Sequence, residues 1–188
     1  MGAATQEEAL AAHLAHALAQ RSGRHVAWTA VGRSGATARD VLRDLVPEVV
    51  GTHDFAVVVL GVNDTLSLTS PRAWRAAVAQ VIGALEPHLA PGGLVVLAGL
   101  PAVGRFTALP QPLRGVLGRQ AATLDRTLAT LAHAPRVLHV PAPVLGSGPM
   151  QAVDRFHPSA LGYGLWGGHL ARETVERWTV AGAPLDLD

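Results

Sequence analysis

The sequence predicts an α/β protein whose parallel sheet has helices on both faces. Segments with apolar residues at helical spacing alternate along the chain with short, Val-rich apolar runs. A continuous apolar run of this kind is typical of a parallel strand that is buried on both faces. No internal repeat and no linker interrupts the 188 residues, so the pattern predicts one domain over residues 1–179 and a loose tail over 180–188.

The composition limits the classes of function. Hydrophobic residues make up 49% of the chain, charged residues 15%, and the formal net charge is +1, which excludes a disordered chain and gives no reason to expect a nucleic-acid partner. The chain contains neither cysteine nor lysine, which excludes thiolate nucleophiles, cysteine-ligated zinc, lysine Schiff bases and Ser–Lys dyads. No apolar run is long enough to span a bilayer and no signal-peptide pattern is present, so we expect a cytoplasmic protein.

Three elements are predicted before the first Val-rich run. Thr5 and Glu8 match a capping box ahead of leucines at helical spacing, which predicts a helix that ends near Gly23. Residues His25–Val31 alternate loosely between two glycines and predict a strand. Apolar residues on one face predict a helix over Thr37–Val46.

The middle of the chain gives the clearest signals. The continuous apolar run Phe55–Leu60 predicts a buried strand. Ser70 is followed by proline at the first helical position, which predicts a helix that runs to about His88. Residues 91–93 predict a turn, and Leu94–Ala98 predicts a second buried strand.

The last third alternates loops with longer helices. Residues 100–112 contain several prolines and predict a long loop, followed by a helix from Leu113 to about residue 133. A short strand is expected over Arg136–Val140, then a Pro/Gly-rich loop over 141–157. Proline starts a final helix over 158–178. The order begins on a helix, where a doubly wound sheet normally begins on a strand.

The first candidate for chemistry is Asp154 with His157. Ligands of open parallel sheets bind beyond the carboxyl ends of the strands, and this pair lies in such a loop. Pro158 makes His157 the expected N-cap of the last helix, where the positive end of the helix dipole favours a neutral ring that can accept a proton. Asp154 can then fix the tautomer of that ring. The alternative is that both residues merely decorate a loop, because Asp-x-x-His occurs easily by chance.

The second and third candidates are the loops 61–64 and 32–37. The Asn63 amide can donate to an anion above the sheet, as an oxyanion hole requires, while Asp64 holds its loop through backbone N–H groups. Gly35 can donate a backbone N–H to the same anion because no side chain blocks the approach. The alternatives are an ordinary Asn-Asp turn and an ordinary turn between a strand and a helix.

Other histidines and the tryptophans predict structure rather than chemistry. His13 and His16 share a helix face without a third ligand, so we expect both to be exposed and not to bind a metal. Six further histidines have no acidic partner at a telling spacing: His25, His53, His88, His133, His139 and His169. Trp74, Trp166 and Trp178 suit core packing. No Gly-x-Gly-x-x-Gly follows a strand, which excludes the dinucleotide fingerprint.

Together and in this order, three motifs resemble blocks two, three and five of the SGNH (GDSL-type) hydrolases: Ser34-Gly35-Ala36-Thr37, Gly61-x-Asn63-Asp64 and Asp154-x-x-His157. The resemblance extends from Thr5 to about Trp178. It implies a three-layer α/β/α sandwich with a flavodoxin-like parallel sheet, and hydrolysis of a small-molecule ester or acylated substrate without a cofactor or metal. By the same resemblance, His157 is the base, Asp154 orients it, and Gly35 and Asn63 are the oxyanion donors.

The sequence departs from this family in the first block. That block is a strand ending in Gly-Asp-Ser, which supplies both the first strand and the nucleophile, and neither is present here. Other serines do not replace it convincingly: Ser34, Ser67, Ser70, Ser147 and Ser159. We therefore expect a sheet whose first strand is missing between His25–Val31 and Phe55–Leu60, as after an N-terminal truncation or a misplaced start codon.

Two other functions remain open at this point. The first is a non-catalytic relative that binds a ligand or serves as an interaction domain on the same fold. The second is an unrelated flavodoxin-like binding domain, which requires the three motifs to be a coincidence. The esterase interpretation itself implies that the chain as given is inactive, because its base has no nucleophile to deprotonate.

Overall fold

The computed structural model describes residues 9–134, 136–145 and 148–180. Residue contacts divide the chain into two compact units. The first comprises residues 1–30, 106–108 and 143–188 and is called the helical unit; the second comprises residues 31–105 and 109–142 and is called the sheet unit. Among the described residues, no helix combines the length and the apolar character that crossing a membrane would require.

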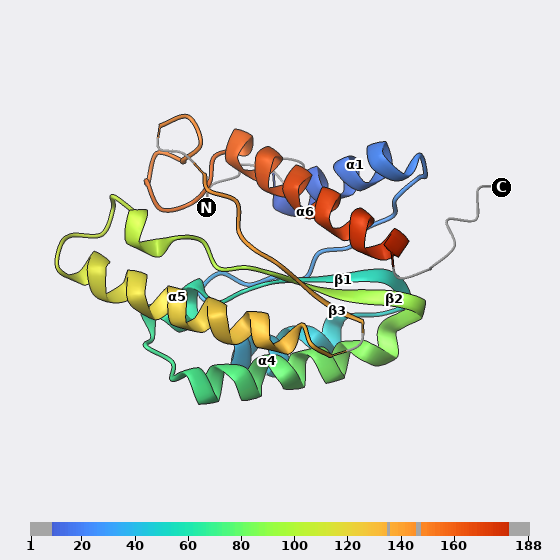
Figure 1. Ribbon diagram of the computed structural model, residues 1–188, viewed down its shortest axis with the longest axis horizontal. Helices are drawn as coiled ribbons and strands as arrows, with labels where there is room; N and C mark the ends of the chain where they lie inside the picture. Colours follow the sequence, from blue (N-terminus) through green and yellow to red (C-terminus); the bar gives the residue numbers. More distant parts are fainter. Residues whose placement is uncertain (1–8, 135, 146–147, 181–188) are drawn as a thin grey trace. The chain divides into compact units, whose positions relative to one another are not determined.

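The sheet unit contains three parallel strands in chain order: β1 (His53–Val59), β2 (Leu89–Ala98) and β3 (Val137–Val140) (Figure 1). β2 is the central strand, and Val96 and Leu97 in it are completely buried. The three Val-rich runs were therefore correctly predicted as parallel strands. β2 is buried along its apolar run because it pairs on both edges. The predicted burial of β1 is wrong: in this edge strand Val58 is buried, but Val59 is 48% exposed.

β2 begins five residues before its predicted start, so the predicted turn at 91–93 is wrong. Residues 91–93 lie within β2, and the register of its pairing with β1 shifts between His53 and Phe55. A Cβ at Gly93 would lie 2.9 Å from the Asp54 carbonyl oxygen. Glycine at this position therefore allows the two backbones to approach closely, where the sequence alone indicated only a chain reversal.

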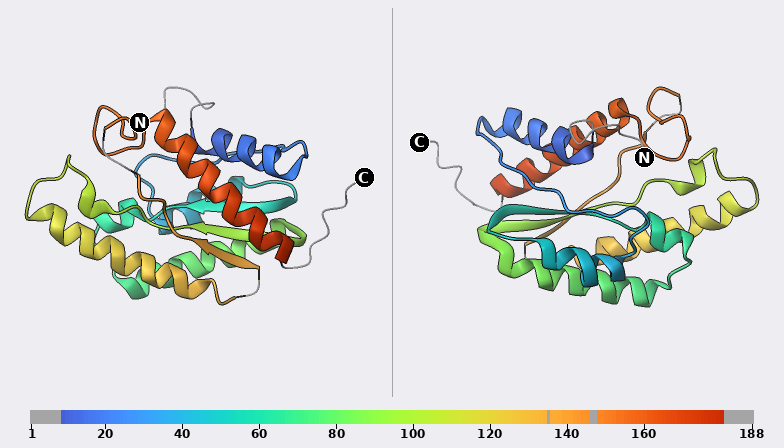
Figure 2. Two further views of the ribbon diagram at one scale, coloured as in Figure 1. Left: turned by 45° about the horizontal axis from the view of Figure 1, so that its top comes forward. Right: turned by 180° about the vertical axis from the view of Figure 1, so that it is seen from behind.

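Helices α4 (Pro71–Leu85) and α5 (Leu113–Leu131) lie side by side against one face of this sheet (Figures 1 and 2). As predicted, Ser70 caps α4: its Oγ accepts from the Ala73 N–H at 3.3 Å, and proline follows. The buried Trp74 ring joins the two helices, because its Nε1 donates to the Leu124 carbonyl at 3.0 Å. The core packing predicted for this tryptophan is confirmed.

The predicted helix over Thr37–Val46 is instead three short turns: α2 (Ala38–Asp40), the π-helical η1 (Val41–Leu45) and the 3-10 turn η2 (Val46–Glu48). Pro47 explains the change, because it has no N–H for the Arg43 carbonyl and its ring would clash with that carbonyl in an α-helix. The Val46 N–H accordingly bonds to the Val41 carbonyl, five residues back.

Three other short helices complete the sheet unit: α3 (Val62–Leu66), η3 (Glu86–His88) and η4 (Val103–Arg105). Of these, η4 contacts α5 most closely. A Cβ at Gly118 of α5 would lie 2.8 Å from the Gly104 Cα. The predicted long loop over 100–112 thus contains one helical turn, η4. The close contact between Gly104 and Gly118 lets this turn pack against α5.

In the helical unit, α1 (Leu10–Ser22) and α6 (Ala160–Val180) pack along each other (Figure 1). A Cβ at Gly167 would lie 2.8 Å from the Leu14 backbone nitrogen, so glycine permits this close approach. As predicted, α1 ends at Gly23, whose φ is 67°. Ala9 occupies its N-cap position, and the predicted capping box at residues 5–8 lies outside the described residues, as does the tail 181–188.

The predicted strand His25–Val31 is wrong. No residue of this segment forms a ladder or a backbone hydrogen bond with another described residue, and the Trp28 side chain is 42% exposed. Loose alternation between glycines is a weak signal for a strand. A strand forms only where a neighbouring strand pairs with its N–H and C=O groups, and the alternation of a segment does not show whether such a neighbour exists. The described sheet therefore has three strands instead of the four predicted, and β1 forms one edge.

The contact between Gly104 and Gly118 generates a prediction for stability. We expect Gly118→Ala to lower the free energy of unfolding by about 1–3 kcal/mol, because the new methyl group meets backbone atoms. Gly83→Ala in α4 is the matched control: its Cβ would meet nothing within 4 Å, so alanine should stabilise the helix by up to about 1 kcal/mol. Urea unfolding followed by circular dichroism measures both, and a Gly118→Ala protein as stable as the parent would contradict the tight contact.

Candidate active site

The Gly35 loop, residues 32–37, leads into α2. The Ala36 N–H donates to the Arg33 carbonyl at 3.3 Å, which closes a turn with Gly35 inside it. Gly35 has a φ of 79°, and a Cβ there would meet nothing within 4 Å. The residue is exposed, and its N–H has no hydrogen-bond acceptor among the described residues. This is the condition that an oxyanion donor must meet before substrate binds.

Asn63 lies just beyond the carboxyl end of β1, in the first turn of α3 rather than in a plain loop. The preceding Gly61 has a φ of 111°, and a Cβ there would lie 2.8–2.9 Å from atoms of the Leu100 side chain. Both the backbone conformation and the space therefore require glycine. The Thr65 N–H and hydroxyl both donate to the Gly61 carbonyl, at 2.9 and 2.8 Å, and fix the turn.

Two side chains connect α3 to the Gly35 loop and to α2. Asn63 Nδ2 donates to the Ala36 carbonyl at 2.9 Å, and Asp64 Oδ2 accepts from the Ala38 N–H at 3.0 Å. The structure therefore brings Asn63 and the neighbourhood of Gly35 together. One N–H of the Asn63 amide remains for an oxyanion. As predicted, Asp64 accepts a hydrogen bond from a backbone N–H group, although this group belongs to α2 and not to the loop of Asp64 itself.

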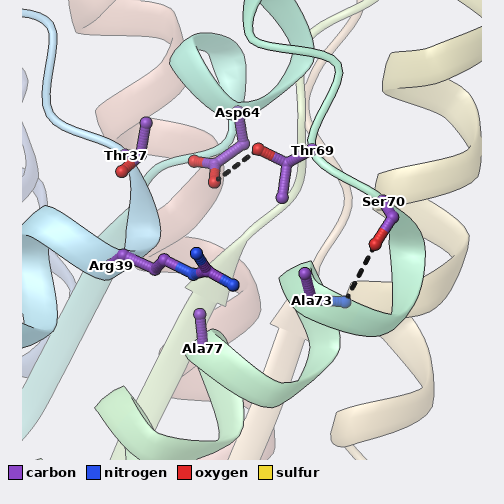
Figure 3. A pocket seen from close by; sticks show the side chains of 7 residues that line it. All are labelled: Thr37, Arg39, Asp64, Thr69, Ser70, Ala73 and Ala77. Carbon is purple, nitrogen blue, oxygen red and sulfur yellow. Dashed lines mark hydrogen bonds between the residues drawn. The ribbon is translucent and has the colours of Figure 1, made fainter.

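The Asp64 side chain is buried, with the residue only 1% exposed. Burial raises the pKa of this carboxyl group, against the opposing effect of hydrogen bonds from the Ala38 N–H and the Thr69 hydroxyl. Asp64 also lines a pocket of about 360 Å³ between α2 and α4, and Figure 3 shows the Arg39 side chain extended into it. The hydroxyls of Thr37, Thr69 and Ser70 complete its polar lining.

In the helical unit, Asp154 binds His157 with both carboxylate oxygens. Oδ2 lies 2.6 Å from His157 Nδ1, while Oδ1 accepts from the backbone N–H groups of Phe156 and His157 at 3.0 and 2.9 Å. The hydrogen bonds from His157, backbone first, hold the pKa of Asp154 well below its usual range. With Nδ1 donating to the carboxylate, a neutral ring carries its lone pair on Nε2.

The surroundings of the dyad leave it accessible and restrict its motion. The two side chains are 43% and 42% exposed, so a solute can reach the ring. The Phe156 ring packs edge-on against the His157 ring and against Phe106, with centroid distances of 5.2 and 5.0 Å. The His157 carbonyl accepts from the Ala152 N–H at 2.9 Å, which closes the loop that carries both residues.

His157 is not the N-cap of the last helix, which corrects the prediction. α6 begins at Ala160, and Ser159 acts as the cap: its hydroxyl accepts from the Gly162 N–H and its carbonyl from the Tyr163 N–H. The backbone of His157 is already committed to the contact with Ala152, and serine is the better capping residue. The effect of the helix dipole that was expected at His157 therefore loses its basis, whereas the contact of Asp154 with Nδ1 is present.

Sequence reasoning missed one carboxylate–histidine pair. His139 on β3 was expected to have no acidic partner, but its Nε2 lies 3.2 Å from Asp125 Oδ1 on α5. That oxygen also accepts from the Leu100 N–H at 2.9 Å. Burial acts to raise the pKa of Asp125, yet its hydrogen bonds to His139 and Leu100 lower it overall. No local spacing could have revealed a contact between a strand and a helix.

The expectation for the histidines of α1 is half right. His16 is exposed and bonds to Gln20, but His13 packs against Gly164 and Gly167 of α6. Its Nε2 is buried and has no hydrogen-bond partner among the described residues. Within the described ranges, no group of three His, Asp or Glu side chains is arranged to hold a metal ion.

Comparison with known proteins identifies relatives over nearly the whole chain. The model of the GDSL-like lipase/acylhydrolase family matches residues 1–165. A GDSL-like esterase of Mycobacterium tuberculosis is 32% identical over 175 residues, which cover 87% of this chain and 54% of the relative. The chain thus spans about half the length of that protein.

Solved structures share the fold at low sequence identity. A family 3 carbohydrate esterase from Clostridium thermocellum is 14% identical with a TM-score of 0.64, covering 92% of this chain and 88% of that one. A carbohydrate acetylesterase from Sinorhizobium meliloti is 17% identical, also with a TM-score of 0.64, covering 91% and 86%. The predicted α/β fold is confirmed. The chain belongs to the GDSL-like lipase/acylhydrolase family, as its three motifs indicated.

Proposed function

We propose that this chain carries the base and the oxyanion donors of a serine ester hydrolase. The observation that supports this most strongly is the dyad of Asp154 and His157, in which the carboxylate holds Nδ1 and leaves Nε2 accessible. His157 is the general base, and Asp154 orients it and stabilises the imidazolium. The Gly35 N–H and the free N–H of the Asn63 amide stabilise the oxyanion.

The chemistry follows from these roles. His157 Nε2 takes the proton of a serine hydroxyl as the serine oxygen attacks the ester carbonyl, and it returns that proton to the leaving alcohol. Water repeats the cycle and releases the acid from the acyl-enzyme. The low pKa of Asp154 keeps its charge in place when the ring becomes positive. The reaction needs no cofactor. Small esters are the first substrates to test, including acetylated carbohydrates, because the Sinorhizobium meliloti protein of the same fold is a carbohydrate acetylesterase.

We further propose that residues 1–188 alone do not supply the nucleophile. The sequence has no Gly-Asp-Ser, and two of its hydroxyls already serve as helix caps, those of Ser70 and Ser159. Within the described part of the helical unit, no serine hydroxyl bonds to His157. Ser34 is exposed but adjoins the oxyanion glycine, and Ser147 lies outside the described residues.

The second candidate function is a non-catalytic domain that binds a ligand on the same fold. The in-frame codons that precede Met1 in the gene distinguish the two functions. A Val/Leu-rich run ending in Gly-Asp-Ser supports the esterase, because it provides both a strand and the serine. A stop codon directly upstream supports the non-catalytic domain.

Hydrolysis of p-nitrophenyl acetate tests the roles of these residues. We expect residues 1–188 to show no activity above buffer, and a version with the Gly-Asp-Ser strand to be active. In that version His157→Ala should nearly abolish turnover, and Asn63→Ala should lower kcat on the order of 10²-fold. His16→Ala, which removes an exposed histidine that bonds to Gln20, is the control and should leave turnover unchanged. Turnover by residues 1–188 that is lost in His157→Ala but survives Ser34→Ala would imply another nucleophile.

The tautomer of His157 provides a test that needs no turnover. In ¹⁵N spectra at neutral pH we expect the neutral ring of His157 to carry its proton on Nδ1, because Asp154 accepts it. Asp154→Asn should shift the ring toward the Nε2–H tautomer, as an amide no longer favours one form. Asp54→Asn, at an exposed aspartate of β1, is the control. An unchanged tautomer in Asp154→Asn would show that the carboxylate does not orient the base.

The same Asp154 predicts a pH dependence. Its pKa is lower in the folded protein than in the unfolded chain, so its contacts stabilise the fold above the unfolded pKa and are lost as pH falls through the folded one. We expect the ¹³C shift of its carboxyl carbon to stay constant from neutral pH to about pH 4, where an ordinary aspartate is half protonated. A midpoint at the ordinary value would contradict the hydrogen bonds to His157 and Phe156.

A further inference from the structure

Both ends of the Gly35 loop are bound by carboxylates of the helical turns that follow it. At the C-terminal end, the Thr37 N–H and hydroxyl donate to Asp40 Oδ2 at 3.0 and 2.6 Å, and the Asp40 N–H returns a long bond of 3.4 Å to that hydroxyl. At the N-terminal end, Arg33 Nη1 lies 2.8 Å from Asp44 Oδ2, and Arg33 Nη2 lies 3.8 Å from Asp40 Oδ1. Asp40 is thus the residue that contacts both ends.

Arg43 joins the two carboxylates into one network. Its Nη2 donates to Asp40 Oδ1 at 2.8 Å, and its Nε donates to Asp44 Oδ1 at 2.6 Å. The arginine side chains are about half exposed or more, whereas the Asp40 side chain is 27% exposed. Exposed ion pairs alone contribute little, so the strongest restraint on the loop comes from the bonds between Asp40 and Thr37.

Gly35 itself has few other restraints. Nothing lies within 4 Å of the position of a Cβ, and the turn around it is closed by a single backbone hydrogen bond of 3.3 Å. The Asn63 amide fixes the neighbouring Ala36 carbonyl but not the Gly35 N–H. A donor for an oxyanion must already point correctly before the charge develops, since reorientation during the reaction would cancel its benefit.

We propose that Asp40 is a positioning residue for Gly35, which it holds as an oxyanion donor through Thr37 and Arg33. This inference rests on the proposed function, in which the Gly35 N–H binds the oxyanion. Asp40 touches neither substrate nor the reacting atoms. The bonds from Thr37, side chain first, lower the pKa of Asp40, so the carboxylate is charged at neutral pH and can hold both ends of the loop.

Backbone ¹⁵N relaxation of the 188-residue chain tests the proposal without any turnover. We expect the Gly35 order parameter to fall from about 0.85 to below about 0.6 in Asp40→Ala. Ser70→Ala is the matched control, because it also removes a side chain that caps a helix of the sheet unit. It should leave Gly35 rigid. If Asp40→Ala does not fold, Thr37→Val removes the hydroxyl bond to Asp40 and should also mobilise Gly35.

The outcomes separate positioning from a general structural role. A rigid Gly35 in a folded Asp40→Ala or Thr37→Val protein overturns the proposal, and so does equal mobility in Ser70→Ala. In the version with the Gly-Asp-Ser strand, Asp40→Ala should lower kcat about tenfold or more with KM unchanged, and Asp40→Asn should restore part of it through its remaining oxygen. Failure of the proposed function is recognised separately, because it would leave hydrolysis insensitive to His157→Ala while the relaxation result stands.

Discussion

The oxyanion side of the proposed site depends on the hydrogen bonds that the buried carboxyl group of Asp64 accepts. Removing a carboxylate from water is costly unless donors surround it, so its contacts with the Ala38 N–H and the Thr69 hydroxyl cannot be given up freely. Those contacts fix the start of α2 beside the first turn of α3. Asn63, the adjacent residue, is then within reach of the Ala36 carbonyl. The Asp64 carboxyl group therefore helps to place Asn63 beside the Gly35 loop.

A second set of contacts supports α3 from the other strands of the sheet unit. Asp125 of α5 accepts from the Leu100 N–H just after β2 and from His139 of β3. The Leu100 side chain then covers Gly61, so closely that a Cβ there would overlap it. The turn that carries Asn63 is thus enclosed between a hydrogen-bonded leucine and the end of β1. Glycine at position 61 is required by this packing as well as by its positive φ.

What the sequence could predict depended on the range of the interactions. The capped start of α4 was predicted from Ser70 and Pro71, because capping acts within one turn. The strands were predicted from continuous apolar runs, but burial on both faces holds for the central β2 and not for the edge strand β1. The strand predicted at His25–Val31 failed because pairing is decided by distant residues. The contact of His139 with Asp125 was missed for the same reason, and the cap by Ser159 was missed because His157 stood next to proline.

The proposed base and the proposed oxyanion donors also differ in the sequence separation of the contacts that position them. Every hydrogen bond within the Asp154–His157 dyad joins residues at most three apart, so the proposed base and the residue that orients it lie in one loop. The Gly35 loop is held by the nearby residues Asp40 and Asp44. The position of Asn63 instead depends on contacts between residues about 26 positions apart, and on a leucine beyond the next strand. Such contacts exist only when the sheet unit is folded. In the proposed site, Asn63 is therefore the residue whose position requires the sheet unit to be folded.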